Sequence, residues 1–119
     1  MNKFDPEPYA ETWRRRNSEE QERIHRKAGE ARLEAERLAR RMVEECSAGR
    51  VHLFGSLASQ DGPRREDFDI DLAITGGSWD CARDIADESG FVVDLCEYDK
   101  APDHIRKRID EQGIVLAEC

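Results

Sequence analysis

Three aspartates and a glycine–serine pair are the residues of this chain whose types and spacing could do chemistry. Gly55 and Ser56 follow a short apolar run, and Asp69 and Asp71 lie two positions apart in a segment of alternating polarity. A third carboxylate, Asp94, stands inside another short apolar run. Successive side chains of a strand point to opposite faces, so Asp69 and Asp71 are predicted to share one face.

The three carboxylates predict a site for divalent metal ions. If the strand that carries Asp94 lies beside the first, all three converge on one side of a small sheet. Two such charges about 5–6 Å apart repel each other by roughly 3 kcal/mol at an effective dielectric of about 20. Mg²⁺ or Mn²⁺, which prefer oxygen ligands, would compensate this repulsion. An EF-hand loop starting at Asp67 is excluded, because Leu72 stands where that loop needs glycine and Ser78 where it needs glutamate.

The glycine–serine pair predicts the phosphate side of the site. A glycine lets a phosphate approach the backbone closely, and Ser56 offers a hydroxyl donor. Leu57 and Ala58 are expected to open a helix whose N-terminal N–H groups favour an anion. Gly-Ser alone is a weak signal. Followed twelve residues later by Asp-x-Asp on an alternating strand, it is typical of metal-dependent phosphoryl or nucleotidyl transfer.

On these residues the chain resembles the minimal nucleotidyltransferases of the DNA polymerase β superfamily. Their signature is Gly-Ser, a spacer, Asp-x-Asp and a later third aspartate, and the resemblance covers roughly residues 50–119. It implies an α+β fold with a small mixed β-sheet of the polymerase-β nucleotidyltransferase type, here preceded by a long N-terminal helix. It also implies transfer of NMP, most simply AMP from ATP, onto a hydroxyl group.

The resemblance assigns a role to each residue of the signature. Asp69 and Asp71 would bind both of two Mg²⁺ or Mn²⁺ ions, and Asp94 would complete the ion that activates the acceptor hydroxyl. Gly55 and Ser56 would hold the β and γ phosphates of ATP or another NTP. The chemistry implied is a two-metal in-line displacement that releases pyrophosphate.

The chain departs from the family pattern in its loop after Gly-Ser. Many members carry an Arg-Gly pair there, whereas this chain reads Ser-Gln-Asp-Gly at 59–62 and has its arginines later, at Arg64 and Arg65. These two are either solvated loop residues or a phosphate clamp. Bulky Phe68 precedes the first carboxylate, where a small polar residue is usual. Both departures bear on how the nucleotide is positioned.

The resemblance also implies a protein partner. Minimal nucleotidyltransferases are often paired with a helical HEPN ribonuclease toxin, and some attach AMP to it. Two function classes follow: an enzyme that modifies its partner, and a non-catalytic antitoxin that neutralises the partner by contact. The complete carboxylate trio favours the enzyme. Modification of an aminoglycoside-type small molecule is less favoured, because the chain has little room for the added domain that such enzymes carry.

Composition narrows the choice of acceptor and compartment. The chain has 119 residues and a net charge of −8, and residues 50–119 carry all of the excess, with eight basic and sixteen acidic side chains. An acidic surface disfavours nucleic acid as the acceptor. No apolar run approaches the roughly 20 residues that span a bilayer, so no membrane association is expected. The four cysteines are Cys46, Cys81, Cys96 and Cys119. They form no CxxC pair, which indicates reduced thiols in a cytoplasmic protein.

Periodicity divides the chain into an N-terminal helical extension, 1–48, and a nucleotidyltransferase domain, 49–119. Ser18 and Gln21 form a capping box, which predicts a helix near 18–47. A shorter helix from Tyr9 to Arg16 is expected before it, and residues 1–7 are expected to be loose. The other expected elements are strands near 50–54, 68–75, 91–97 and 114–117 and helices near 79–88 and 103–111.

The long helix carries a stripe of small and apolar residues at spacings of three and four: Ile24, Ala28, Ala31, Ala35, Leu38, Met42 and Cys46. Such a helix is about 45 Å long, whereas a 70-residue domain has a radius of gyration of about 11 Å. Either it kinks at Gly29 and folds back, or its overhanging half, with Ile24, presents a seam to a second copy or another protein. The heptad-like spacing favours the seam and a weak homodimer.

Overall fold

The structure, a computed structural model, describes residues 7–119, with side chains from Arg14 onward. Four strands form one sheet in the order β3-β2-β1-β4. The strands are β1 (Arg50–Phe54), β2 (Ile70–Thr75), β3 (Val93–Glu97) and β4 (Ile114–Glu118). The helices are α1 (Glu7–Cys46), α2 (Trp79–Asp87) and α3 (Asp103–Gln112), with single 3₁₀ turns η1 (Gly55–Leu57) and η2 (Tyr98–Lys100).

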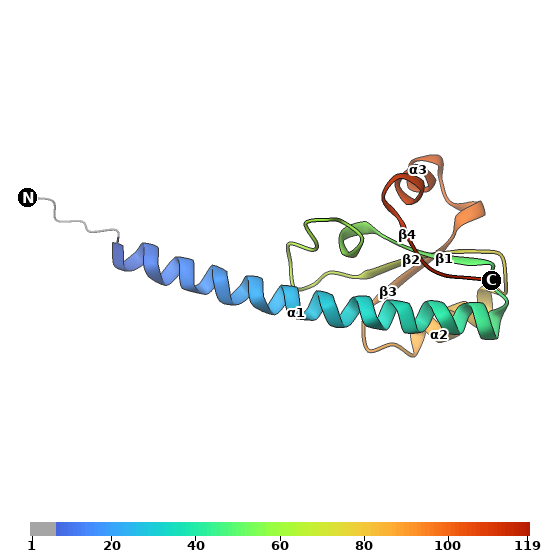
Figure 1. Cartoon of the computed structure of the whole chain (residues 1–119), viewed down its shortest axis with the longest axis horizontal. Helices are drawn as coiled ribbons and strands as arrows, with labels where there is room; N and C mark the ends of the chain where they lie inside the picture. The colour runs from blue at the N-terminus through green and yellow to red at the C-terminus, as the bar shows by residue number, and fades with distance from the viewer. Residues whose placement is uncertain (1–6) are drawn as a thin grey trace, which may run out of the picture.

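The sheet is mixed, and helices lie on both of its faces. Strand β1 pairs antiparallel with β2 and with β4, whereas β2 and β3 are parallel and joined through α2. Helices α1 and α2 lie on one side of the sheet and α3 lies on the other (Figure 1). The predicted α+β fold, with its small mixed sheet and long N-terminal helix, is therefore confirmed.

Helix α1 is one continuous element of 40 residues rather than two helices that meet near Ser18. It extends well beyond the sheet, and the molecule measures 71 × 28 × 18 Å (Figure 1). The capping signal at Ser18 is overridden because starting a second helix is costly, whereas one interior serine costs only about 0.5 kcal/mol. The loose segment predicted at residues 1–7 lies outside the described residues, apart from Glu7, which begins α1.

The apolar stripe of α1 is buried in its own domain, so the predicted seam for a weak homodimer is wrong. From Ala28 to Cys46 the stripe belongs to the main core, together with inward side chains of β1, β2 and α2. Ile24, expected on the overhang, is only 4% exposed and lines a hollow of about 170 Å³ together with the loop at 60–63. The helix also runs through Gly29 without a break, so it does not fold back there (Figure 1).

Polar contacts tie α1 to the loop between η1 and β2. Arg32 Nε donates to the carbonyl oxygen of Leu57 at 3.0 Å, and Lys27 Nζ donates to that of Glu66 at 2.6 Å. Arg23 forms an exposed ion pair with the Glu66 side chain at 3.1 Å. This loop carries the chain from the Gly-Ser turn to the aspartates, so α1 helps to position both. Within residues 7–119 no helix combines the length and the apolar character needed to span a membrane.

A disulfide joins the end of α1 to the start of α2, which corrects the expectation of reduced thiols for this pair. Cys46 and Cys81 are bonded, with their Cα atoms 5.5 Å apart. The turn after α1 brings them together: Ser47 is left-handed at φ 61°, and the Ala48 N–H closes the helix on the carbonyl of Met42 at 3.2 Å. The thiols of Cys96 and Cys119 are free.

Candidate functional site

Two of the three predicted carboxylates stand side by side on neighbouring strands. Asp71 of β2 and Asp94 of β3 are direct partners in the parallel register. Asp71 is half-buried and Asp94 is exposed, as expected for a strand pair whose outer member is the sheet edge. The next residues on the same face, Ala73 and Cys96, pack beneath α3. The carboxylates therefore lie on the α3 face, at the open end of the sheet.

Asp69 lies just before β2 and not within it. The strand was expected from residue 68, but it begins at Ile70, and Asp69 is exposed. Phe68 turns towards α1, where Lys27 Nζ lies 5.3 Å from its ring centre. This contact explains the bulky residue at a position that is usually small and polar, because it anchors the loop that leads to the aspartates. Asp69 thus precedes the observed strand, although its charge still acts on Asp71.

Gly55 lies directly against the carboxylate of Asp71. It has φ +75°, a conformation that side-chain-bearing residues rarely adopt. A Cβ built on it would collide with the Asp71 carboxylate and approach its Cγ to 3.1 Å. Phe54, just before it, is the register partner of Asp71. The turn after β1 and the middle carboxylate therefore occupy one compact site that only glycine permits.

Ser56 lies in η1, a single 3₁₀ turn of three residues. The turn closes with the Ala58 N–H donating to the Gly55 carbonyl at 3.1 Å and the Ser59 N–H to the Ser56 carbonyl at 3.2 Å. The expected short turn is present, but it does not continue into a helix. The anion-binding helix N-terminus expected after Ser56 is therefore wrong, which leaves the turn backbone and the Ser56 hydroxyl as donors.

Mutual repulsion and burial act together on Asp71. Burial raises the pKa of its carboxyl to about 6, the negative charges of Asp94 and Asp69 add to the rise, and Arg108 opposes it. Burial, with Asp94 and Asp71 nearby, also raises the pKa of the Cys96 thiol to about 11, which keeps it protonated and unreactive at neutral pH. The site is thus a cluster of interacting negative charges, which a cation would stabilise.

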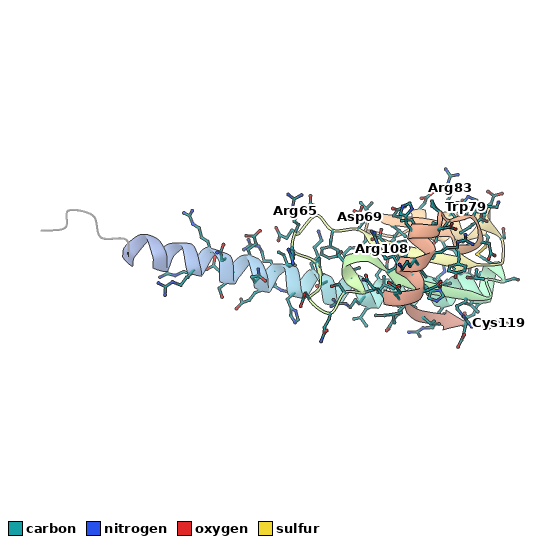
Figure 2. The ribbon with its side chains drawn as sticks, turned by 90° about the horizontal axis from the view of Figure 1, so that it is seen from above. Arg65, Asp69, Trp79, Arg83, Arg108 and Cys119 are labelled. Atoms are coloured by element: carbon teal, nitrogen blue, oxygen red, sulfur yellow. A yellow bond between two sulfur atoms is a disulfide. The ribbon has the colours of Figure 1, made fainter. Side chains whose placement is uncertain are left out.

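A cavity of about 480 Å³ opens beside the two paired carboxylates on the α3 face. Its wall is completed by residues of α3 and its N-cap, of η2, of the end of β3 and of the start of α2. Sequence reasoning missed these residues: Trp79, Glu97, Lys100, Pro102, Ile105 and Arg108. The signal for Arg108 was the run Arg106-Lys107-Arg108, which stands out in an acidic region. Figure 2 looks onto this face and labels Arg108 on α3, with Asp69 on the segment before β2.

The two loop arginines lie away from this cavity. Arg64 and Arg65 are exposed, and neither is among the residues that line it. Figure 2 shows Arg65 on the loop that faces the long helix, on the far side of Asp69 from Trp79. The solvated-loop interpretation of these arginines fits the structure better than the phosphate clamp.

Comparison with solved structures identifies the fold. A chain from a toxin–antitoxin crystal structure with AMP-PNP is 22% identical, with a TM-score of 0.56 over 71% of this chain and 73% of that one. A chain of an MntA–HepT toxin–antitoxin complex is 19% identical, with a TM-score of 0.53 over 74% and 73%.

A third similar chain comes from a complex of the tri-AMPylated Shewanella oneidensis HEPN toxin with its MNT antitoxin. It is 20% identical, with a TM-score of 0.50 over 77% of this chain and 73% of that one. No protein-family model and no curated protein matches the chain. The likeness to these chains shows that this chain shares their fold.

Proposed function

We propose that this protein is a minimal nucleotidyltransferase that transfers NMP, most simply AMP from ATP, to a hydroxyl group of a protein partner and serves as antitoxin to a HEPN ribonuclease. The observation that carries the proposal is the pairing of Asp71 with Asp94 beside the Gly55 turn, in a chain with this fold. Without a ligand, a half-buried carboxylate beside an exposed one destabilises the folded protein. The arrangement therefore points to a ligand that offsets the charge of the two carboxylates.

The donor set fits Mg²⁺ or Mn²⁺. All candidate ligands are carboxylate oxygens, the ligands that hard divalent ions prefer, and their charges act on one another at Asp71. Among the described residues no three His, Cys, Asp or Glu side chains already form a metal-binding group. Asp71 and Asp94 would therefore bind the ions first. Asp69, on its exposed segment, would then move to add its carboxylate as a further ligand.

Each residue of the site would have a separate role in binding the ions or the nucleotide. Asp69 and Asp71 would bind both ions, and Asp94 would complete the ion nearer the acceptor. When bound, the two ions would polarise the acceptor hydroxyl and the leaving pyrophosphate. Gly55 and Ser56, on the β1 side of Asp71, would hold the β and γ phosphates. The cavity on the β3 side leaves room for the rest of the nucleotide and for the acceptor.

The similar complexes support the nucleotide and the partner. One contains AMP-PNP, and another contains a tri-AMPylated HEPN toxin with an MNT antitoxin. A further similar structure is a mutant in which two aspartates separated by one residue are both replaced by glutamate, the spacing of Asp69 and Asp71 here. The acidic surface of residues 50–119 adds to this support, because it favours a protein acceptor over nucleic acid.

The test is AMP transfer to a HEPN protein encoded beside this chain. We expect Mg-ATP to yield an AMP adduct on the partner, seen by intact-protein mass spectrometry, together with released pyrophosphate. Asp94→Ala should abolish transfer while weakening nucleotide binding less. Asp84→Asn, an exposed carboxylate on α2, is the matched control and should retain full activity. Transfer by Asp94→Ala at the wild-type rate would show that the roles are misassigned.

The second candidate function is a non-catalytic antitoxin that neutralises its partner by contact. Two observations favour it: Asp69 lies outside β2, and no ready metal-binding group is present in the described residues. A variant with both Asp71→Asn and Asp94→Ala separates the two functions. If that variant still silences the partner ribonuclease as fully as wild type, contact alone is sufficient. If silencing is lost while the complex still forms, catalysis is required.

A further inference from the structure

The cavity beside Asp71 and Asp94 has two cations in its wall, and only one of them is free. Lys100 is held by Glu97 in an ion pair at 3.1 Å. Arg108 lines the same cavity from α3, and within residues 14–119 no carboxylate lies within ion-pair distance of it. An arginine without a partner in an acidic domain, beside two carboxylates that attract it, is available for an anionic ligand.

The other arginines compared with Arg108 are either paired with a carboxylate or outside the cavity. Arg106, two residues earlier on α3, pairs with Asp103 in the first turn of the same helix. Arg64 and Arg65 do not reach the cavity. The loop after Gly-Ser, at 59–62, contains no basic residue. Arg108 is therefore the unpaired cation that the described structure brings to the carboxylates.

We propose that Arg108 is a catalytic residue that binds the non-bridging oxygens of the phosphate being transferred, a task for which the loop after Gly-Ser offers no arginine. The inference rests on the proposed function and adds a residue to it. Arg108 lines the cavity together with Asp71 and Asp94, which would flank the reacting centre, whereas Gly55 and Ser56, which would hold the β and γ phosphates, are not among its lining residues. The α-phosphate, which would react between these carboxylates, is therefore the group that Arg108 would contact.

The chemistry explains why a cation is needed there. The acceptor oxygen forms a bond to the α-phosphorus, the bond from that phosphorus to the pyrophosphate oxygen breaks, and the hydroxyl proton passes to water. Pyrophosphate leaves with the bonding electron pair. Charge spreads over the non-bridging oxygens as the phosphate passes between the two groups, and a planar guanidinium can donate two hydrogen bonds to them.

The experiment compares wild type with Arg108→Ala, Arg108→Lys and the matched control Arg106→Ala. Thermal melts first establish that each variant is folded. Transfer is measured with ATP, and binding is measured calorimetrically with α,β-methylene-ATP and Mg²⁺, which cannot transfer AMP. We expect Arg108→Ala to lower the transfer rate by about 100-fold or more, with a smaller effect on binding. Arg108→Lys should recover part of the rate, and Arg106→Ala should stay near wild type.

A phosphorothioate at the α position tests the contact directly. Wild type should use one diastereomer of ATPαS more slowly than ATP, because sulfur accepts the Arg108 hydrogen bonds poorly. In Arg108→Ala this penalty should shrink by about tenfold or more, which a purely structural role would not produce. Suppose that wild type is active and that Arg108→Ala is equally active, or that the rate penalty for ATPαS is the same in both. This inference would then be refuted, and the proposed function would stand. A wild type that neither binds the analogue nor transfers AMP would overturn the proposed function and this inference together.

Discussion

Asp71→Asn should stabilise the metal-free protein, and the gain should depend on pH. The pKa of Asp71 rises from 3.8 to about 6 on folding, mainly because the carboxyl is buried and secondly because of Asp94. About two pKa units correspond to roughly 3 kcal/mol, and discounting for the partial exposure of the group leaves about 1–2 kcal/mol. Asparagine keeps the shape of the side chain and removes the charge that causes this cost.

The sign follows from the protonation states. Below about pH 4 the carboxyl is protonated in both folded and unfolded chains, so it costs nothing. Between about pH 4 and 6 the unfolded chain loses its proton while the folded chain keeps it, so the penalty grows and is complete above pH 6. Asp71→Asn should thus match wild type near pH 4 and exceed it by about 1–2 kcal/mol at pH 7.5.

The assay is denaturant unfolding at pH 4, 5, 6 and 7.5 in EDTA, repeated with Mn²⁺, together with thermal unfolding at pH 7.5. At pH 7.5 we expect a melting temperature about 3–8 °C above wild type in EDTA. Mn²⁺ should stabilise wild type and leave the variant unchanged, which reverses their order. Asp84→Asn is the control, an exposed carboxylate away from the site. A stability difference that is the same at every pH, or a variant that is weaker at pH 7.5, would refute the reasoning.

Two further substitutions and one chemical reduction test the site, the core and the disulfide, each with an internal control. Gly55→Ala should cost about 1–2 kcal/mol for its left-handed φ and abolish transfer by displacing the Asp71 carboxylate, whereas Gly90→Ala, with no neighbour within 4 Å, should be neutral in both assays. Ile24→Glu should lower the unfolding free energy by about 2–4 kcal/mol, and Leu33→Glu, at a 69% exposed site, should change it by less than about 0.5 kcal/mol. Reducing the Cys46–Cys81 bond, which spans 35 residues, should cost about 2–4 kcal/mol, and Cys119→Ser should not alter that loss.

The sheet could be predicted from local patterns because its strands are short and cleanly bounded. The strand expected at 50–54 is observed as Arg50–Phe54, between a turn and the Gly-Ser pair. The strands expected at 68–75 and 91–97 each begin two residues later, at Ile70 and Val93. In both places an aromatic residue of the expected strand serves as an anchor outside it. Periodicity cannot distinguish an anchor from a strand residue, because both are apolar.

The partner of the long helix could not be predicted for a related reason. The stripe on α1 correctly indicates which face is buried, but spacing says nothing about what buries it. Alanines such as Ala31 and Ala35, both fully buried, suit a close helix–helix seam and a close helix–sheet contact equally well. Ile24 is covered by a loop that the sequence suggests only as a polar stretch. The Cys46–Cys81 bond was missed likewise, because only the fold brings the two residues together.

Separation along the sequence also decides which parts of the site could be predicted. The Gly-Ser turn and the paired aspartates can be recognised because each is local. Arg108 lies 37 residues beyond Asp71 and lines the same cavity only because α3 packs on that face of the sheet (Figure 1). A domain with twice as many acidic as basic residues repels a free polyphosphate at long range. If the protein binds a nucleotide as proposed, the attraction would be short-range and would come from cations held at the carboxylates and from Arg108 in the wall of the same cavity. Recognition would then be confined to the surroundings of the reacting phosphate, and the rest of the acidic surface would remain available to the proposed protein partner.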